Sequence, residues 1–283
     1  MPPRARASRD LEAIRDVRAE AALLGGLRAS RVATRIALLG GLASIGTDAA
    51  WDRIVRIALE DEEEEMRSAA RLRSRSGGDA APSALNRRLE TWYALDARGR
   101  ARGQPEAEVR LRAVELASGL TGFGGRRALY VLALLDPSSR VRHEAAAGLA
   151  RVPDERVFRG LVDAVRSGHP MLQPRAASAL EAYADPRAIG PLIDALDRLL
   201  RDRAGGVLRA DSPFTLPAQM SGPAQVPLSL AAGADEQGSA GLSLLPSEVS
   251  ALQRLSGRTF GEDVGRWRAW LAAQATPDEG DPR

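Results

Sequence analysis

The chain has 283 residues, of which 40 are basic and 37 acidic, and its formal net charge is +3. Every basic residue is an arginine and cysteine is absent, so disulfides and thiolate metal sites are excluded. The small net charge gives little support to nucleic-acid binding. The longest apolar run, Ile36–Ile45, is too short to cross a bilayer. No signal peptide is seen, so the cytoplasm is the default expectation.

The N-terminal part predicts helices that end in an acidic run. Residues 9–27 predict one helix, which we interpret as an N-terminal cap or half of a degenerate repeat, and residues 31–45 and 48–59 predict the first full helix pair. The run Glu60–Glu65 follows, with several arginines after it. Such a run could hold a cation. We favour carboxylates that support a helix N-terminus and pair with arginines one turn on.

The second and third pairs are separated by an insertion. Met66-Arg67 and Val109-Arg110 open these pairs and lie 43 residues apart, about a dozen more than the later period, so we place the surplus near residues 91–104. This segment contains Arg98, Arg100 and Arg102 among glycines. It could contact phosphate backbones, but it has no interleaved aromatic residues, and a surface loop is favoured.

The clearest repeat is Asp136–Leu196, a two-helix unit that occurs twice. Equivalent apolar residues of the two copies lie 31 residues apart, as in Val141 and Leu172, Leu149 and Leu180, Leu161 and Leu192, and Val165 and Leu196. Ser138 or Ser139 is expected to cap the first helix, and Asp154 the second. Each unit leaves an apolar face that only a neighbour can cover, so the fixed period predicts an α-solenoid.

The composition changes after the repeats. Residues 205–246 are rich in Gly, Pro and Ala but contain apolar residues such as Met220, so we expect an irregular excursion that packs on the solenoid with a short hairpin. Residues 247–273 predict a helical cap, and residues 274–283 a disordered tail. Trp267 and Trp270 could stack a ligand, but a plug over the open core of the last repeat is favoured.

Two segments resemble known families. Val141–Ala145 (V-R-x-x-A) and the D-P-R-A-I turn Asp185–Ile189 resemble HEAT repeats of the bilin-lyase-like subclass, over about residues 30–200. Leu252–Trp270 resembles an L-T-G-x-x-F-G…W-x-x-W module behind HEAT arrays in some bacterial proteins, with Ser256 in place of the threonine. The resemblance implies an all-α fold, an α-solenoid of about five HEAT-like pairs over residues 1–204, with the excursion and the cap behind it. The same repeat serves many unrelated tasks.

One dipeptide suggests metal chemistry. His143-Glu144 resembles the iron-ligating motifs of HEAT-repeat deoxyhypusine hydroxylase, a class that needs several such motifs. Here the corresponding residues one period on are Pro174-Arg175. No nucleophile or base can be named for bilin-lyase chemistry, and no Gly-x-Ser-x-Gly elbow occurs. We therefore expect no enzyme activity, cofactor or metal.

Arginines recur at one repeat position, in Arg67, Arg110 and Arg142. They could form a ladder such as nucleic-acid-binding HEAT-like proteins use, but this position usually has an internal role, and Gln173 breaks the series. The candidate interaction surface comprises Arg67, Arg98, Arg100, Arg102, Arg110, Arg142, His143 and Glu144. We favour a non-catalytic adaptor for a protein or peptide. The alternatives are a nucleic-acid-binding protein, a bilin-lyase-like enzyme and a HEAT-type metal-dependent hydroxylase.

Overall fold

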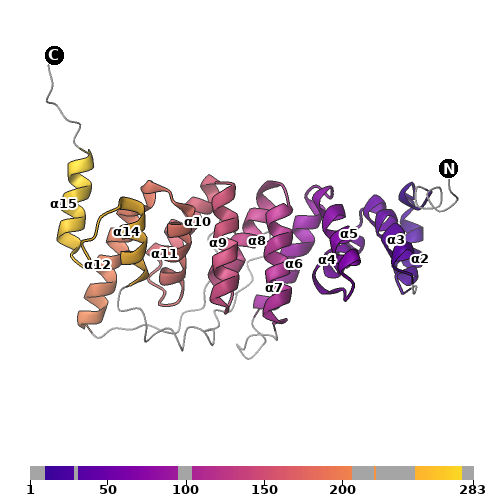
Figure 1. Ribbon diagram of the computed structural model, residues 1–283, viewed down its shortest axis with the longest axis horizontal. Helices are drawn as coiled ribbons and strands as arrows, with labels where there is room; N and C mark the ends of the chain where they lie inside the picture. The colour runs from indigo at the N-terminus through magenta and orange to yellow at the C-terminus, as the bar shows by residue number, and fades with distance from the viewer. Residues whose placement is uncertain (1–9, 29–30, 95–103, 206–219, 221–245, 276–283) are drawn as a thin grey trace, which may run out of the picture. The chain divides into compact units, whose positions relative to one another are not determined.

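The computed structural model describes residues 10–28, 31–94, 104–205, 220 and 246–275. These residues form an all-α solenoid of successive helix pairs and contain no β-strand (Figure 1). The chain divides into two compact units, residues 1–131 and 132–283. Among the described helices, none combines the length and the apolar character that a membrane span requires.

The first unit begins with a short turn and continues with helix pairs. Its elements are η1 (Val17–Ala19), α2 (Glu20–Gly26), α3 (Val32–Ile45), α4 (Asp48–Glu60), α5 (Glu64–Arg75), α6 (Ala80–Tyr93), α7 (Ala107–Gly119) and the start of α8 (Gly122–Leu135). The first helices of the pairs, α3, α5 and α7, contact one another in sequence, and so do the second helices α4 and α6. The first two predicted pairs are therefore present in this unit, and the third pair begins in it.

The single helix predicted over residues 9–27 is wrong. The side chain of Asp16 accepts hydrogen bonds from the backbone N–H and the guanidinium of Arg18, and it caps the separate turn η1. A short acidic side chain that captures a nearby N–H offers the backbone an alternative to a continuous helix. α2 follows η1 directly at Glu20, so the interruption of the predicted helix lies at residues 13–16.

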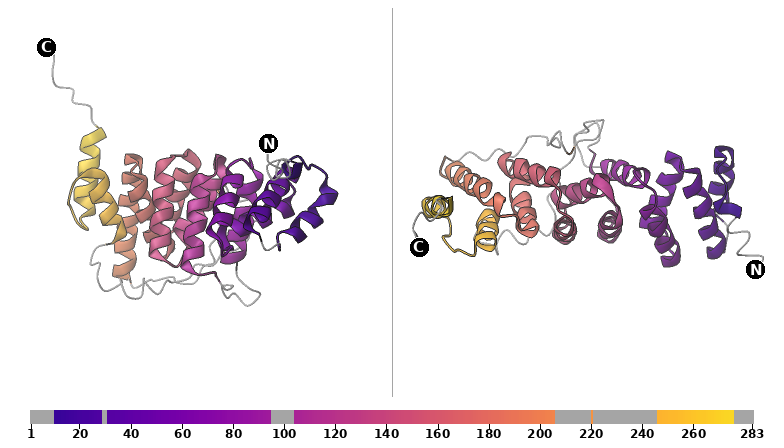
Figure 2. Two further views of the ribbon diagram at one scale, coloured as in Figure 1. Left: turned by 45° about the vertical axis from the view of Figure 1, so that its right-hand side comes forward. Right: turned by 90° about the horizontal axis from the view of Figure 1, so that it is seen from above.

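The second unit contains the two copies of the sequence repeat. Its elements are the end of α8, α9 (Ser139–Arg151), α10 (Glu155–Arg166), α11 (Leu172–Tyr183), η2 (Pro186–Ala188), α12 (Ile189–Gly205), α14 (Ser247–Ser256) and α15 (Val264–Ala275). Within this unit α9, α11 and α14 form one row, and α10 and α12 form the other (Figure 2, right). The apolar stripes face each other between the rows, where Val141, Leu161, Leu180 and Leu192 are fully buried.

The turns of the repeat are built from acidic side chains. Asp154 is the N-cap of α10 and accepts from the N–H of Arg156, as predicted, and Asp185 accepts from the N–H of Arg187 in the same way. The serine prediction fails at Ser138, which occupies the N-cap of α9 without a capping bond from its side chain. The carboxylate of Asp136 instead accepts from the N–H of Ser138. An acid two residues earlier thus orders this turn.

The C-terminal helices pack on the end of the second unit. α14 contacts α11 and α12, and α15 contacts α12. Gly257, at φ +68°, ends α14 in the left-handed conformation that glycine adopts without strain. The hairpin predicted for the excursion lies outside the described residues. Met220, which the structure does describe, is buried. Nearly all of the predicted tail also lies outside them.

Candidate interaction surface

The recurring arginines hold the turns that precede their own helices. Nη1 of Arg67 donates to the carbonyl oxygens of Asp61 (2.6 Å) and Glu62 (2.8 Å). Nη1 of Arg142 donates to those of Asp136 (2.9 Å) and Pro137 (3.0 Å). Arg110 donates in the same way to the carbonyl of Pro105. We call Arg67, Arg110 and Arg142 the turn arginines. Their internal role is confirmed, because all three donate to carbonyl groups of the turn before their own helix.

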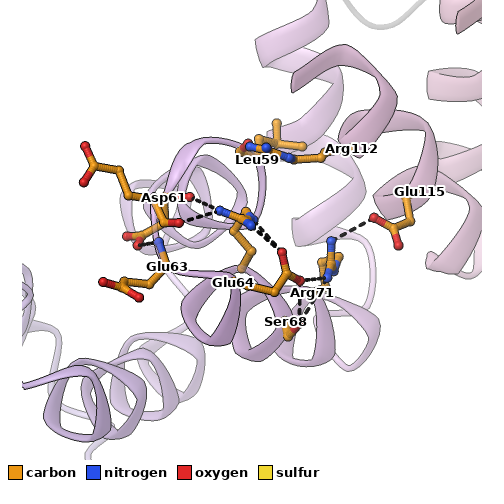
Figure 3. Close-up of polar contacts among 10 residues, drawn as sticks. Leu59, Asp61, Glu63, Glu64, Ser68, Arg71, Arg112 and Glu115 are labelled. Carbon is orange, nitrogen blue, oxygen red and sulfur yellow. Dashed lines mark hydrogen bonds and ion pairs between the residues drawn. The ribbon is translucent and has the colours of Figure 1, made fainter. Parts of the chain in front are cut away.

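The acidic run supports a helix start, as predicted. α5 begins at Glu64, whose carboxylate accepts from Nε of Arg67 (2.9 Å), Nη2 of Arg71 (2.6 Å) and the hydroxyl of Ser68 (2.9 Å). Figure 3 shows Arg71 and Ser68 beside Glu64. Arg71 also bonds Glu115 of α7 at 2.8 Å. Hydrogen bonding to Arg67, more than to the other partners, lowers the pKa of Glu64 to about 2.

We expect the carboxyl group of Glu64 to titrate near pH 2 in a carbon-detected NMR titration. Because its folded pKa is depressed, its stabilising contribution is present above the unfolded pKa near 4.5 and is lost as the pH falls toward 2. Arg67→Gln removes the largest cause of the shift and should move the midpoint upward. A midpoint that does not respond to this replacement would contradict the assignment.

Replacement of Arg67 by lysine should destabilise the first unit by about 1–2 kcal/mol in chemical denaturation. Lysine keeps the charge but lacks the planar fork that reaches two carbonyl groups and a carboxylate together. The matched control is Arg56→Lys, because Arg56 forms a surface pair with Glu60 at i,i+4. This replacement should change stability by less than about 0.5 kcal/mol. Equal effects of the two replacements would rule out a special role for the turn arginine.

A second set of arginines has the same geometry in both units. Nη1 of Arg112 donates to the carbonyl of Leu59 (3.0 Å), and Nη1 of Arg175 donates to the carbonyl of Leu134 (2.9 Å). Each acceptor lies in the last turn of a second helix, α4 or α8, where carbonyl groups lack helical partners and a cation is favoured. Sequence reasoning missed this role. The sequence did contain a signal for this role, because Arg112 and Arg175 each stand two residues after the repeat position of the turn arginines, which we call the turn position.

Gln173 occupies the turn position in α11 but has different partners. Its Nε2 donates to the carboxylate of Glu248 (2.9 Å) and to the carbonyl of Ala195 (3.3 Å). Glu248 lies in the first turn of α14, so Gln173 connects the last repeat to the C-terminal helices. The break in the arginine series therefore marks the junction where α14 packs against α11.

A groove lies between α9 and α11 in the second unit. It has a volume of about 380 Å³ and is lined by Ala133, Ser139, Arg142, His143, Ala146, Pro174, Arg175, Ser178, Ala179 and Ser247. The three alanines are buried and leave room at its base, whereas His143 and Ser178 are exposed. We call this feature the α9–α11 groove. It includes two predicted surface residues, Arg142 and His143.

The remaining predicted site residues do not gather there. Glu144 is exposed on α9 next to His143 but does not line the groove. Arg67 and Arg110 belong to the first unit, and Arg98, Arg100 and Arg102 lie outside the described residues. No group of three or more His, Asp or Glu side chains that could hold a metal ion occurs in the part of the chain that the structure describes.

Residues 127–210 match the family model of HEAT repeats. This segment contains α9 to α12, the two copies of the 31-residue period. A comparison with curated proteins finds no match. HEAT repeats are thus present in this solenoid, while the bilin-lyase-like subclass and the C-terminal module stay predictions.

Proposed function

We propose that this protein is a non-catalytic adaptor that binds a protein or peptide segment in the α9–α11 groove. The observation that supports this most is an open groove between two neighbouring helices of the second unit, with buried alanines in its lining. Stacked helical repeats form such surfaces by geometry alone and commonly use them to bind other proteins. In this proposal residues 1–204 form the solenoid and residues 247–273 cap it.

The turn arginines provide less support for nucleic-acid binding. Each donates to carbonyl groups of its own chain, and the exposed fractions of the Arg67 side chain and of Arg110 are only 13% and 7%. Phosphate contacts need cations that reach outward from the surface. The α9–α11 groove is lined by serines, alanines and a proline beside Arg142, His143 and Arg175, and its small side chains leave room for a peptide.

The groove can be tested by filling it. Ser178 is exposed on α11, and its hydroxyl donates to the carbonyl of Pro174, four residues earlier. Ser178→Trp should therefore block the groove without disturbing the core. Ser83 on α6 is a matched control, because it is also exposed and also donates to the carbonyl four residues earlier, that of Asp79.

The measurement is selection of random peptides displayed on phage against the immobilised full chain. We expect enriched peptides that bind the wild type and Ser83→Trp but not Ser178→Trp, with all three proteins equally folded by circular dichroism. If no enriched peptide distinguishes Ser178→Trp from the other two proteins, the proposed function is wrong.

A further inference from the structure

We infer that α14 and α15 form a releasable cap, which opens locally while α9–α12 stay folded, and that Glu248 sets how readily the cap opens. The inference goes beyond the proposed function, because it concerns a motion of the C-terminal helices and requires no ligand. It follows from one buried acidic residue in α14, the helix that packs on α11 and α12 at the end of the second unit.

Glu248 interrupts an otherwise apolar buried face of α14. Val249, Ala251 and Leu252 are fully buried, and Glu248 beside them is 1% exposed. Its Oε1 accepts a hydrogen bond from Nε2 of Gln173 at 2.9 Å, whereas its Oε2 is buried and has no hydrogen-bond partner among the described residues. Burial of a carboxylate with one oxygen unpaired costs free energy. Glu248 therefore weakens the contact that its apolar neighbours stabilise.

The equivalent position of α9 does not carry this cost. Val141 in α9 and Val249 in α14 are each the third residue of their helix, and both are fully buried. The residue before them is the exposed Arg140 in α9 and the buried Glu248 in α14. The buried acid is thus a property of α14 and not of the other helix of this row that begins in the same way.

The remaining polar contacts of the cap do little to offset the buried acid. Arg254 of α14 pairs with Glu181 and Arg268 of α15 pairs with Asp197, and these arginine side chains are 75% and 54% exposed. Such surface pairs contribute little stability. Glu248 lies in the first turn of α14, where the helix dipole compensates part of its charge. Opening would hydrate both of its oxygens, so the cap should open well before the solenoid unfolds.

Opening of the cap would also change the α9–α11 groove. Ser247, the first residue of α14, lines this groove, so the groove is complete only when the cap is closed. A ligand that contacts Ser247 would favour the closed cap, and by linkage the closed cap would favour the ligand. The cap is therefore a device that could regulate binding in the groove.

The test is native-state hydrogen exchange of the full chain. We expect the amides of α14 to exchange through an opening that leaves α9 and α10 protected, at least about tenfold faster than the amides of those helices. Glu248→Gln keeps the shape of the side chain and an acceptor for Gln173, but it removes the charge. This replacement should slow exchange in α14 about tenfold and leave α9 and α10 unchanged. Glu248→Leu should act in the same direction, because Nε2 of Gln173 keeps the carbonyl of Ala195.

A control variant removes the same charge from the surface of the cap. Glu262 is exposed between α14 and α15 and pairs with Arg203 at 3.4 Å, so Glu262→Gln should change exchange in α14 by less than about twofold. If α14 exchanges only together with α9 and α10, or if neither replacement of Glu248 slows it, the inference is wrong. Because this measurement uses no peptide, failure of the phage selection would overturn the proposed function and leave this inference standing.

Discussion

Replacement of Trp267 by alanine is expected to lower the free energy of unfolding by about 3–5 kcal/mol. Trp267 is the largest of the fully buried side chains among the described residues. Its ring packs edge-on against Phe260 at 4.8 Å and Trp270 at 6.3 Å between centroids, and its Nε1 donates to the carbonyl of Gly261 at 2.9 Å. Alanine would leave a cavity and an unpaired carbonyl together.

The loss of stability in the Trp267 variant should be concentrated in the C-terminal helices. In a stack of repeats each unit is stabilised mainly by its neighbours, so the terminal helices open first. Hydrogen exchange should show lost protection in α14 and α15 before α9. Arg268→Ala on the same helix is the control, because Arg268 is exposed and forms surface pairs with Asp194 and Asp197. A loss below about 1 kcal/mol in the Trp267 variant would contradict our proposal that these helices cap the solenoid.

Replacement of Gln173 by leucine should destabilise the second unit by about 2–3 kcal/mol. Glu248 is 1% exposed, and its Oε1 accepts from Gln173, while its Oε2 has no hydrogen-bond partner among the described residues. Leucine would leave a buried carboxylate without that donor. Leaving a buried charge without compensation is among the larger effects a single replacement can have.

A double-mutant cycle with Glu248→Gln tests this reason. Glutamine keeps the shape of the side chain but removes the charge, so Gln173→Leu should be less destabilising in the Glu248→Gln background than in the wild type. Denaturation midpoints and slopes of the four proteins give the coupling energy. Additive effects would show that Gln173 acts by packing and not through the carboxylate.

Much of the fold could be predicted from the sequence because it depends on local patterns. The 31-residue period and the apolar stripes of Val141 and Leu161 identify the pairs, and Asp154 marks a helix start. The failures are also local but depend on competing hydrogen bonds. Asp16 captures the N–H of Arg18 and interrupts a helical pattern, and Asp136 accepts from the N–H of Ser138 in the turn where a cap by the Ser138 side chain was expected. The periodicity of apolar residues cannot predict which polar side chain accepts a hydrogen bond from a given backbone N–H.

The candidate site was less predictable because its geometry depends on contacts distant in sequence. His143 and Arg142 could be singled out, but nothing local to Arg175 or Ser247 places them beside these residues. The internal role of Arg67 follows from its place in the repeat, whereas the carbonyl partners of Arg112 and Arg175 lie in a helix of an earlier pair. The role of Gln173 could not be predicted without knowing that α14 packs beside it, because its partner Glu248 lies in α14.

The bonds from Arg112 and Arg175 have a consequence for shortening this array. Each arginine lies in the first helix of a pair, and its acceptor lies in the second helix of the pair two places earlier in the chain. The bond of Arg112 therefore spans the pair α5–α6, and the bond of Arg175 spans the pair α9–α10. Excision of α9–α10 alone would remove the spacer that brings Arg175 to Leu134. The array therefore has second-neighbour coupling, in contrast to the nearest-neighbour behaviour usual for such repeats, and engineered deletions should preserve its register best when two adjacent pairs are removed together.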